Sequence, residues 1–136
     1  MRIVLDTNVL LQALPVKSSY RPIFDAIRFR QIELAVSTAI LLEYAEILSC
    51  HTSPTVAQNA LALLLGPVAA RQQSIYFMFR LIPTDPDDNK FVDCAIASQA
   101  DYLVTNDAHF RVLKQVKFPI IKLLTAQEFL AVLKQP

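Results

Sequence analysis

The fold of this chain is constrained most by an alternation of short aliphatic runs with longer segments that carry helix signals. Each run is rich in β-branched or aliphatic residues, as expected of a strand buried on both faces. Strands are predicted at 2–5, 33–36, around 81–82, 102–104 and 119–122. The alternation predicts an α/β fold with three α/β/α layers, in which helices cover both faces of a mostly parallel sheet of about five strands.

Length and composition exclude several classes of protein. The 136 residues fit a single domain spanning 1–136, with no repeat or linker. The chain is 54% hydrophobic and 18% charged, but no apolar run reaches the ~20 residues needed to cross a membrane. The chain has one glycine, Gly66, which excludes glycine-rich phosphate loops of the ATP or dinucleotide type. The share of apolar residues is higher than in an ordinary soluble protein, and we expect the additional apolar surface to form a protein interface.

The two cysteines bear on the cellular compartment. Cys50 and Cys94 both lie in apolar stretches of expected helices. We predict that both are buried, reduced thiols, as is typical of a cytoplasmic protein.

The segments between the expected strands carry helix start and stop signals. Helices are expected at 9–14, 22–30, 38–50, 55–65, 85–100, 108–115 and 125–133. The apolar segment 68–79 is left open between helix and irregular structure. Together with 55–65 it is the favoured surface for a partner or a second copy, with simple core packing as the alternative.

Two of the predicted strands end in the same way, with a polar turn and an acid. Asp6 follows the run at 2–5, and Asp107 follows the run at 102–104. In open α/β sheets, ligands bind at the carboxyl edge of the strands. We therefore predict that both acids belong to a site at that edge; as the alternative, each caps the helix that follows it.

Three further acids lie in predicted helices and are expected to converge on the same edge. Glu43 lies at the border of an apolar helix face, Asp88 lies in a first helical turn, and Asp93 lies inside the same helix. Each also has a simpler interpretation. Glu43 could simply lie at the boundary between the buried and exposed faces of its helix. The negative charge of Asp88 is favoured by the helix dipole at the start of its helix, and Asp93 could pair with Lys90.

The formal net charge of +1 conceals a division along the chain. Residues 85–107 hold six acids and one base, for a net charge of −5, whereas the remainder holds twelve bases and six acids, for +6. Basic side chains attract phosphates, but clustered carboxylates repel them unless cations intervene. The division favours a metal-dependent enzyme acting on a polyanion; the alternative is ordinary surface charge.

Several carboxylates held close together repel one another and stay ionised only with cations between them. Oxygen ligands without His or Cys select hard ions, so one or two Mg²⁺ or Mn²⁺ ions are expected. Such ions activate water and neutralise charge during hydrolysis of a phosphodiester bond. The predicted catalytic acids are Asp6, Glu43, Asp88, Asp93 and Asp107, and all but Glu43 are predicted metal ligands.

Taken in order, these motifs resemble the PIN-domain ribonucleases, and among them the toxin half of VapBC-type bacterial toxin–antitoxin modules. The most diagnostic segments are VDCAIAS at 92–98 and LVTND at 103–107, with DTN at 6–8 as a weaker match. The resemblance spans essentially the whole chain and has an indistinct middle.

The resemblance implies a PIN-like fold and a Mg²⁺- or Mn²⁺-dependent endonuclease that cuts RNA. It also implies a homodimer and a small antitoxin that occupies the groove. Asp6, Glu43, Asp93 and Asp107 match the acidic quartet of the family. Asp88 matches an acid found in part of the family, so the resemblance leaves open whether Asp88 or Asp93 is the direct metal ligand.

Residues beside the acids are expected to contact substrate or to support the metal ligands. Thr105 and Asn106 match polar residues of the family next to the last acid, and Thr7 and Asn8 follow the first acid. His109 is interpreted as an exposed helix residue, because water activation would fall to the metal.

Two other functions compete with the nuclease. A phosphotransferase with an aspartyl nucleophile would need a second acid two residues after Asp6, where this chain has Asn8. A catalytically inactive PIN-like module that binds RNA or protein would use the same basic charge and apolar surface, although the retention of every acid argues against it.

Overall fold

The computed structural model describes residues 1–66 and 70–135, and its centre is a sheet in the order β3–β2–β1–β4–β5. All four strand pairings are parallel. The strands are β1 (Arg2–Leu5), β2 (Glu33–Val36), β3 (Ala70–Gln72), β4 (Tyr102–Val104) and β5 (Leu123–Leu124). The predicted α/β class with a parallel sheet of about five strands is confirmed.

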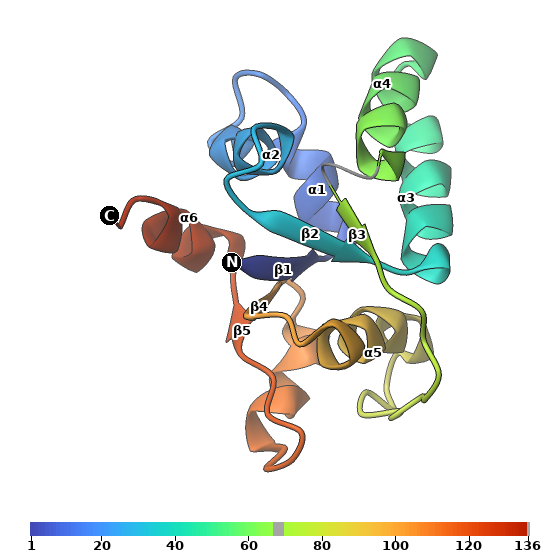
Figure 1. The fold of residues 1–136 in the computed structure, drawn as a ribbon, viewed down its shortest axis with the longest axis vertical. Coiled ribbons are helices and arrows are strands. Elements are labelled where there is room, and N and C mark those ends of the chain that lie inside the picture. The colour runs from blue at the N-terminus through green and yellow to red at the C-terminus, as the bar shows by residue number, and fades with distance from the viewer. Residues whose placement is uncertain (67–69, 136) are drawn as a thin grey trace.

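Helices cover both faces of this sheet (Figure 1). Helices α1 to α4 lie on one side, whereas α5 packs under β1, β2 and β4 on the other. Helix α6 packs beside β5 and α2. The helices are α1 (Thr7–Ala13), α2 (Arg21–Arg28), α3 (Thr38–His51), α4 (Pro54–Leu65), α5 (Asn89–Ser98) and α6 (Ala126–Leu133), with 3₁₀ turns η1 (Pro86–Asp88) and η2 (Ala108–Gln115).

Local signals explain where several helices begin. The Ser37 hydroxyl accepts a hydrogen bond from the Ile40 N–H and starts α3. Thr125 and Glu128 form the expected capping box at the start of α6. Asp85 caps the 3₁₀ turn that leads into α5. The central strand β1 buries Ile3, Val4 and Leu5 completely, as its aliphatic sequence predicts.

The prediction of a third strand around 81–82 was wrong. The third strand is Ala70–Gln72, an edge strand whose last two residues are exposed, so it lacks an apolar signature. Ile82 is buried, but its backbone N–H and C=O bond to the side chain of Asn89 and not to a neighbouring strand. An apolar residue there fills the core without joining the sheet.

Three smaller expectations also need correction. The last strand is Leu123–Leu124 and not 119–122, although the Lys122 carbonyl already accepts the Leu103 N–H. In the segment 68–79, which the sequence left open between helix and irregular structure, residues 68–69 lie outside the described residues and 73–79 are irregular. Of the two segments favoured as a partner surface, only 55–65 is therefore helical, as α4. Cys94 is buried as predicted, whereas Cys50 is exposed near the end of α3.

Among the described residues, no helix combines the length and the apolar character required to span a bilayer.

Candidate active site

The parallel pairing of β1 with β4 brings the first and last acids of the motif to one edge of the sheet. Leu5 is in register with Val104, and the Asp6 N–H donates to the Val104 carbonyl. The Thr105 hydroxyl donates to Asp6 Oδ2 at 2.7 Å and accepts the Asp107 N–H at 3.0 Å. Thr105 therefore connects the two acids.

Asp6 is buried, with 6% of its surface exposed. Burial raises the pKa of its carboxyl, and repulsion from Glu43 and Asp107 adds to that effect, while the hydrogen bond from Thr105 opposes it. Three acids from separate elements thus act on one another at the carboxyl edge of the sheet.

Glu43 reaches this edge from α3 and has two partners. Its Oε2 accepts a hydrogen bond from the Thr7 hydroxyl, at the start of α1. Its Oε1 lies 2.6 Å from Lys90 Nζ, at the start of α5. Lys90 is thereby the partner of Glu43 and not of Asp93, so the pairing offered for Asp93 was wrong.

Asp88 faces the other acids from the end of η1. Within the described part of the chain, its buried Oδ2 has no hydrogen-bond partner. Burial, together with repulsion from Asp85, Asp107 and Asp6, raises the pKa of Asp88 to about 7. A carboxyl with an unsatisfied buried oxygen among like charges is costly unless a cation is bound there.

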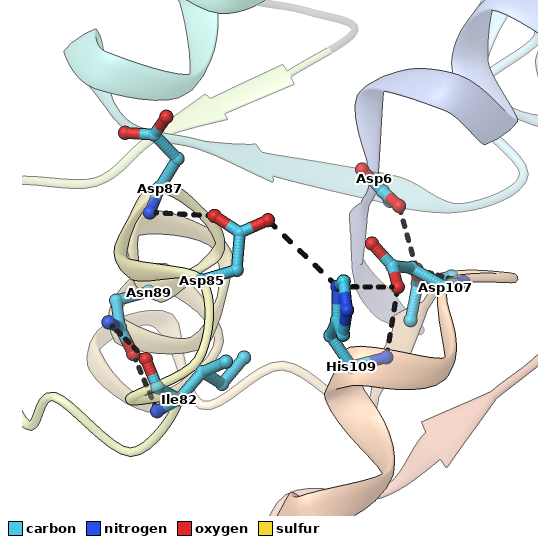
Figure 2. Close-up of polar contacts among 8 residues, drawn as sticks. Asp6, Ile82, Asp85, Asp87, Asn89, Asp107 and His109 are labelled. Atoms are coloured by element: carbon cyan, nitrogen blue, oxygen red, sulfur yellow. Dashed lines mark hydrogen bonds and ion pairs between the residues drawn. The ribbon is translucent and has the colours of Figure 1, made fainter.

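Asp85 and His109 approach each other from η1 and η2, as Figure 2 shows. His109 Nδ1 lies 4.0 Å from Asp85 Oδ2 and 3.2 Å from Asp107 Oδ1. Asp107 also caps η2, because its Oδ1 accepts the His109 N–H at 2.9 Å. Capping a helix and lying close to Asp6 were considered as alternatives for Asp107, but the structure shows both.

One group of side chains is compact enough to share an ion. Ligand atoms of Asp85, Asp88 and His109 all lie within 4.8 Å of one another. Among residues 1–66 and 70–135, Asp6, Glu43 and Asp107 do not form such a group, although their charges interact. Asp88 belongs to both sets, since Asp6 and Asp107 also raise its pKa.

Asp93 does not belong to this group within the described residues, although it lies on the same helix as Lys90. Asp93 is 5% exposed, and its Oδ1 accepts the Phe79 N–H at 3.0 Å. Burial raises the pKa of Asp93, and this hydrogen bond opposes the shift. Together with the bonds between Asn89 and Ile82, it attaches the segment 79–82 to α5.

Asn8 and Asn106, also expected near the site, are both exposed. The Asn106 side chain accepts the Ala126 N–H at 2.9 Å and so fixes the start of α6.

The sequence did not predict that Asp85 and His109 would cluster with Asp88, nor that Lys90 would contact Glu43. Asp85 has a complete explanation as a cap, and His109 is 57% exposed in its side chain. A usable signal was present in the spacing. Asp85 stands three residues before Asp88, and His109 stands two residues after Asp107, so both accompany an acid already selected.

The donor set fits a divalent cation. Carboxylate oxygens dominate, as Mg²⁺ and Mn²⁺ prefer, and one imidazole nitrogen is added, which Mn²⁺ tolerates better than Mg²⁺. The buried, unpartnered Oδ2 of Asp88 supplies the observation that favours a bound cation over a purely structural cluster.

The family model described as "PIN domain" matches residues 2–109. Among solved structures, the chain is similar to the crystal structure of VapBC2 from Rickettsia felis bound to a DNA fragment from their promoter. That match has a TM-score of 0.62 and 21% identity, and it covers 92% of this chain and 98% of the other. No curated protein sequence matched significantly.

Proposed function

This chain belongs to the PIN domain family, and we propose that it is a metal-dependent endoribonuclease that hydrolyses phosphodiester bonds of RNA. The observation that carries the proposal is Asp88, whose buried oxygen has no partner within the described residues and whose pKa is raised to about 7 among Asp85, Asp107 and Asp6. Because this arrangement is unfavourable in isolation, a bound cation is the simplest compensation.

We assign metal binding to the acids that face one another. Asp88 is the central ligand: its ligand atoms and those of Asp85 and His109 lie within 4.8 Å of one another, and the charges of Asp6 and Asp107 also act on it. Mg²⁺ or Mn²⁺ bound there would supply an activated water and neutralise the charge that develops on the phosphate.

The remaining residues position these ligands. Thr105 orients the carboxyl of Asp6, and Thr7 with Lys90 orients that of Glu43. Asp93 is assigned to holding the segment 79–82 through the Phe79 N–H. Of the two candidates that the motif left open, Asp88 is therefore our choice as the direct ligand.

The test is cleavage of a fluorophore-labelled RNA by purified, partner-free protein with Mn²⁺, Mg²⁺ or EDTA. We expect cleavage that requires the metal and falls at least about 100-fold in Asp6→Asn, as expected when a metal ligand is lost. Asp87→Asn is the matched control, because the Asp87 side chain is exposed and points away from His109 in Figure 2.

The competing proposal is a catalytically inactive module that binds RNA or protein. It would be favoured if the partner-free protein bound RNA but cut none at any metal concentration, with Asp6→Asn indistinguishable from the natural sequence. Cleavage that persists in EDTA would contradict both proposals and would point to a contaminating nuclease or to metal-free chemistry.

We also propose that the protein is the toxin of a toxin–antitoxin pair. A groove of about 950 Å³ between α1, α2 and α4 is lined by apolar side chains that include Leu11, Phe24 and Val56. It would hold an apolar segment of a small antitoxin. In co-expression with any small protein that is encoded next to this chain and co-purifies with it, Val56→Arg should abolish co-purification, whereas Gln58→Arg on the same helix should not.

A homodimer is proposed as the second assembly. Tyr76, Phe77 and Met78 are 92%, 66% and 68% exposed and form an apolar strip that a second copy would cover. Analytical ultracentrifugation should give a dimer that Phe77→Asp converts to a monomer. A monomeric natural protein would refute this assignment without affecting the nuclease proposal.

A further inference from the structure

A pocket lies between β3 and the first turn of α3. It has a volume of about 370 Å³, within the range of small-ligand pockets. Its lining residues include Ser37, Thr38, Gln72, Gln73, Ser74 and Ile75. Both β2 and β3 end at this pocket, so it occupies the same carboxyl edge of the sheet as Asp6.

The lining is uncharged and rich in groups that both donate and accept hydrogen bonds. The Ser37 hydroxyl is used by the Ile40 N–H, and the Gln73 amide donates to the Ser74 carbonyl. Within residues 1–66 and 70–135, the Gln72 amide and the Thr38 hydroxyl have no side-chain hydrogen bond. Amides and hydroxyls can contact either a phosphate or a nucleobase, but among the described residues no cationic side chain lines this pocket to favour a phosphate, whereas amides and hydroxyls suffice to read the polar edge of a base.

The pocket is one helical turn from the proposed site of reaction. Ala39 lines the pocket, and Glu43 follows four residues later on the same face of α3. A rise of 1.5 Å per residue separates them by about 6 Å along the helix axis. A nucleotide whose base entered the pocket would therefore lie next to the acids.

We propose that this pocket binds one nucleobase of a single-stranded RNA beside the acidic site, with the Gln72 amide reading the polar edge of the base. The proposal rests on the proposed nuclease function and adds a determinant of its sequence preference. A glutamine amide suits adenine in particular, because it can bond the N6 and N7 positions together.

The test is binding of four labelled homopolymers, of A, C, G and U, by full-length Asp6→Asn protein in Mg²⁺, followed by fluorescence anisotropy. We expect a preference for one base, with A the first candidate. Gln72→Ala should weaken binding of the preferred polymer about 10-fold, as loss of a bidentate contact predicts, and the other three by less than about twofold. Gln58→Ala, at an exposed amide on α4, is the matched control.

A second variant tests the pocket without removing a polar group. Ala39 is exposed in the first turn of α3, so Ala39→Leu should preserve the helix while filling the pocket, and it should abolish the base preference. Circular dichroism melts confirm that both variants fold. The proposal is overturned if the Asp6→Asn protein binds all four polymers equally, or if Gln72→Ala weakens all four to the same extent.

The two proposals fail in different ways. Metal-dependent cleavage with no effect of Gln72→Ala on base preference would refute the pocket and leave the nuclease intact. Base-selective binding that depends on Gln72, in a natural chain that cuts no RNA, would refute the nuclease and leave the pocket intact.

Discussion

Asp88 and Asp93 lie five residues apart around the start of α5, and burial raises the pKa of both carboxyls, yet their neighbours differ. Asp88 faces Asp85, Asp107 and Asp6 and has a buried oxygen without a partner in the described chain. Asp93 faces the Phe79 N–H and is satisfied by it. The charges around these two acids, and not burial alone, are therefore our reason for proposing Asp88 and not Asp93 as a metal ligand.

The largest expected effect separates these two acids by activity. Asp88→Asn should lower the rate of RNA cleavage at least about 100-fold, because it removes the proposed central ligand. Asp93→Asn should stay within about fivefold of the natural rate, because its amide oxygen still accepts the Phe79 N–H. Initial rates at saturating Mn²⁺ measure both. If Asp93→Asn lowered the cleavage rate more than Asp88→Asn, the metal ligand would be Asp93 and not Asp88.

Stability should rank the same two positions in the opposite order. Asp93→Ala removes the acceptor of the partly buried Phe79 N–H and should lower the free energy of unfolding by about 1–3 kcal/mol. Asp88→Ala removes a repelled carboxyl and should cost little in EDTA at pH 7. Urea unfolding measures both, with Asp87→Ala as the exposed control. A large loss at Asp88 without metal would mean that its carboxyl has a structural partner.

The dependence of stability on pH sharpens the comparison further. The pKa of Asp88 is raised from 3.8 to about 7, so the folded state holds this proton more tightly than the unfolded state does. Its contribution to stability is present below about pH 4 and is lost as the pH rises through about 7. The raised pKa of Asp6 acts in the same direction.

Divalent ions should reverse this loss, because they bind the ionised carboxylates. We expect Mn²⁺ to raise the melting temperature more at pH 8 than at pH 5, where protons compete for Asp88. Thermal melts with and without Mn²⁺ at pH 5 and pH 8 test this. In Asp88→Asn, the Mn²⁺-induced shift in melting temperature should be nearly the same at the two pH values. An equal Mn²⁺ effect at both values would show that the metal does not bind these carboxylates.

The different surroundings of Asp88 and Asp93 could not be predicted from the sequence, and the reason is physical. Spacing placed both acids on one helix and could predict that helix, the strands at 2–5 and 102–104 and the sheet edge where Asp6 and Asp107 meet. The partner of Asp93, however, is the backbone of Phe79, which belongs to an irregular segment. A backbone N–H is present at almost every residue, so no side chain at 79 could indicate that contact.

The same limit explains the errors around the third strand. Leu81 and Ile82 look like a strand because they are apolar, but Asn89 engages the backbone of Ile82. Ala70–Gln72 looks polar because it is an exposed edge. Side-chain patterns report burial well and backbone pairing poorly. Asp6, Thr105 and Asp107 were predictable because parallel strands fix backbone pairing by topology.

The smallest expected effect concerns Lys90, which lies between the two acids in sequence and holds Glu43 at 2.6 Å. Its ammonium is a fixed cation at the edge of the site. Lys90→Gln should tighten Mn²⁺ binding by less than about fivefold, because both partners are partly exposed and solvent screens the charge. Isothermal titration calorimetry measures the Mn²⁺ affinity of the natural sequence and of Lys90→Gln, with Lys117→Gln as the control.

Weaker Mn²⁺ binding in Lys90→Gln would carry a different meaning. It would show that Lys90 acts mainly by orienting Glu43, and that a disordered Glu43 carboxyl costs more than the removed charge gains. Since the Thr7 hydroxyl still bonds Glu43 in that variant, the double change of Lys90→Gln with Thr7→Val tests this explanation. Additive effects on Mn²⁺ affinity would indicate that Lys90 and Thr7 act independently, whereas a double variant much weaker than the sum would indicate that they share control of the Glu43 position.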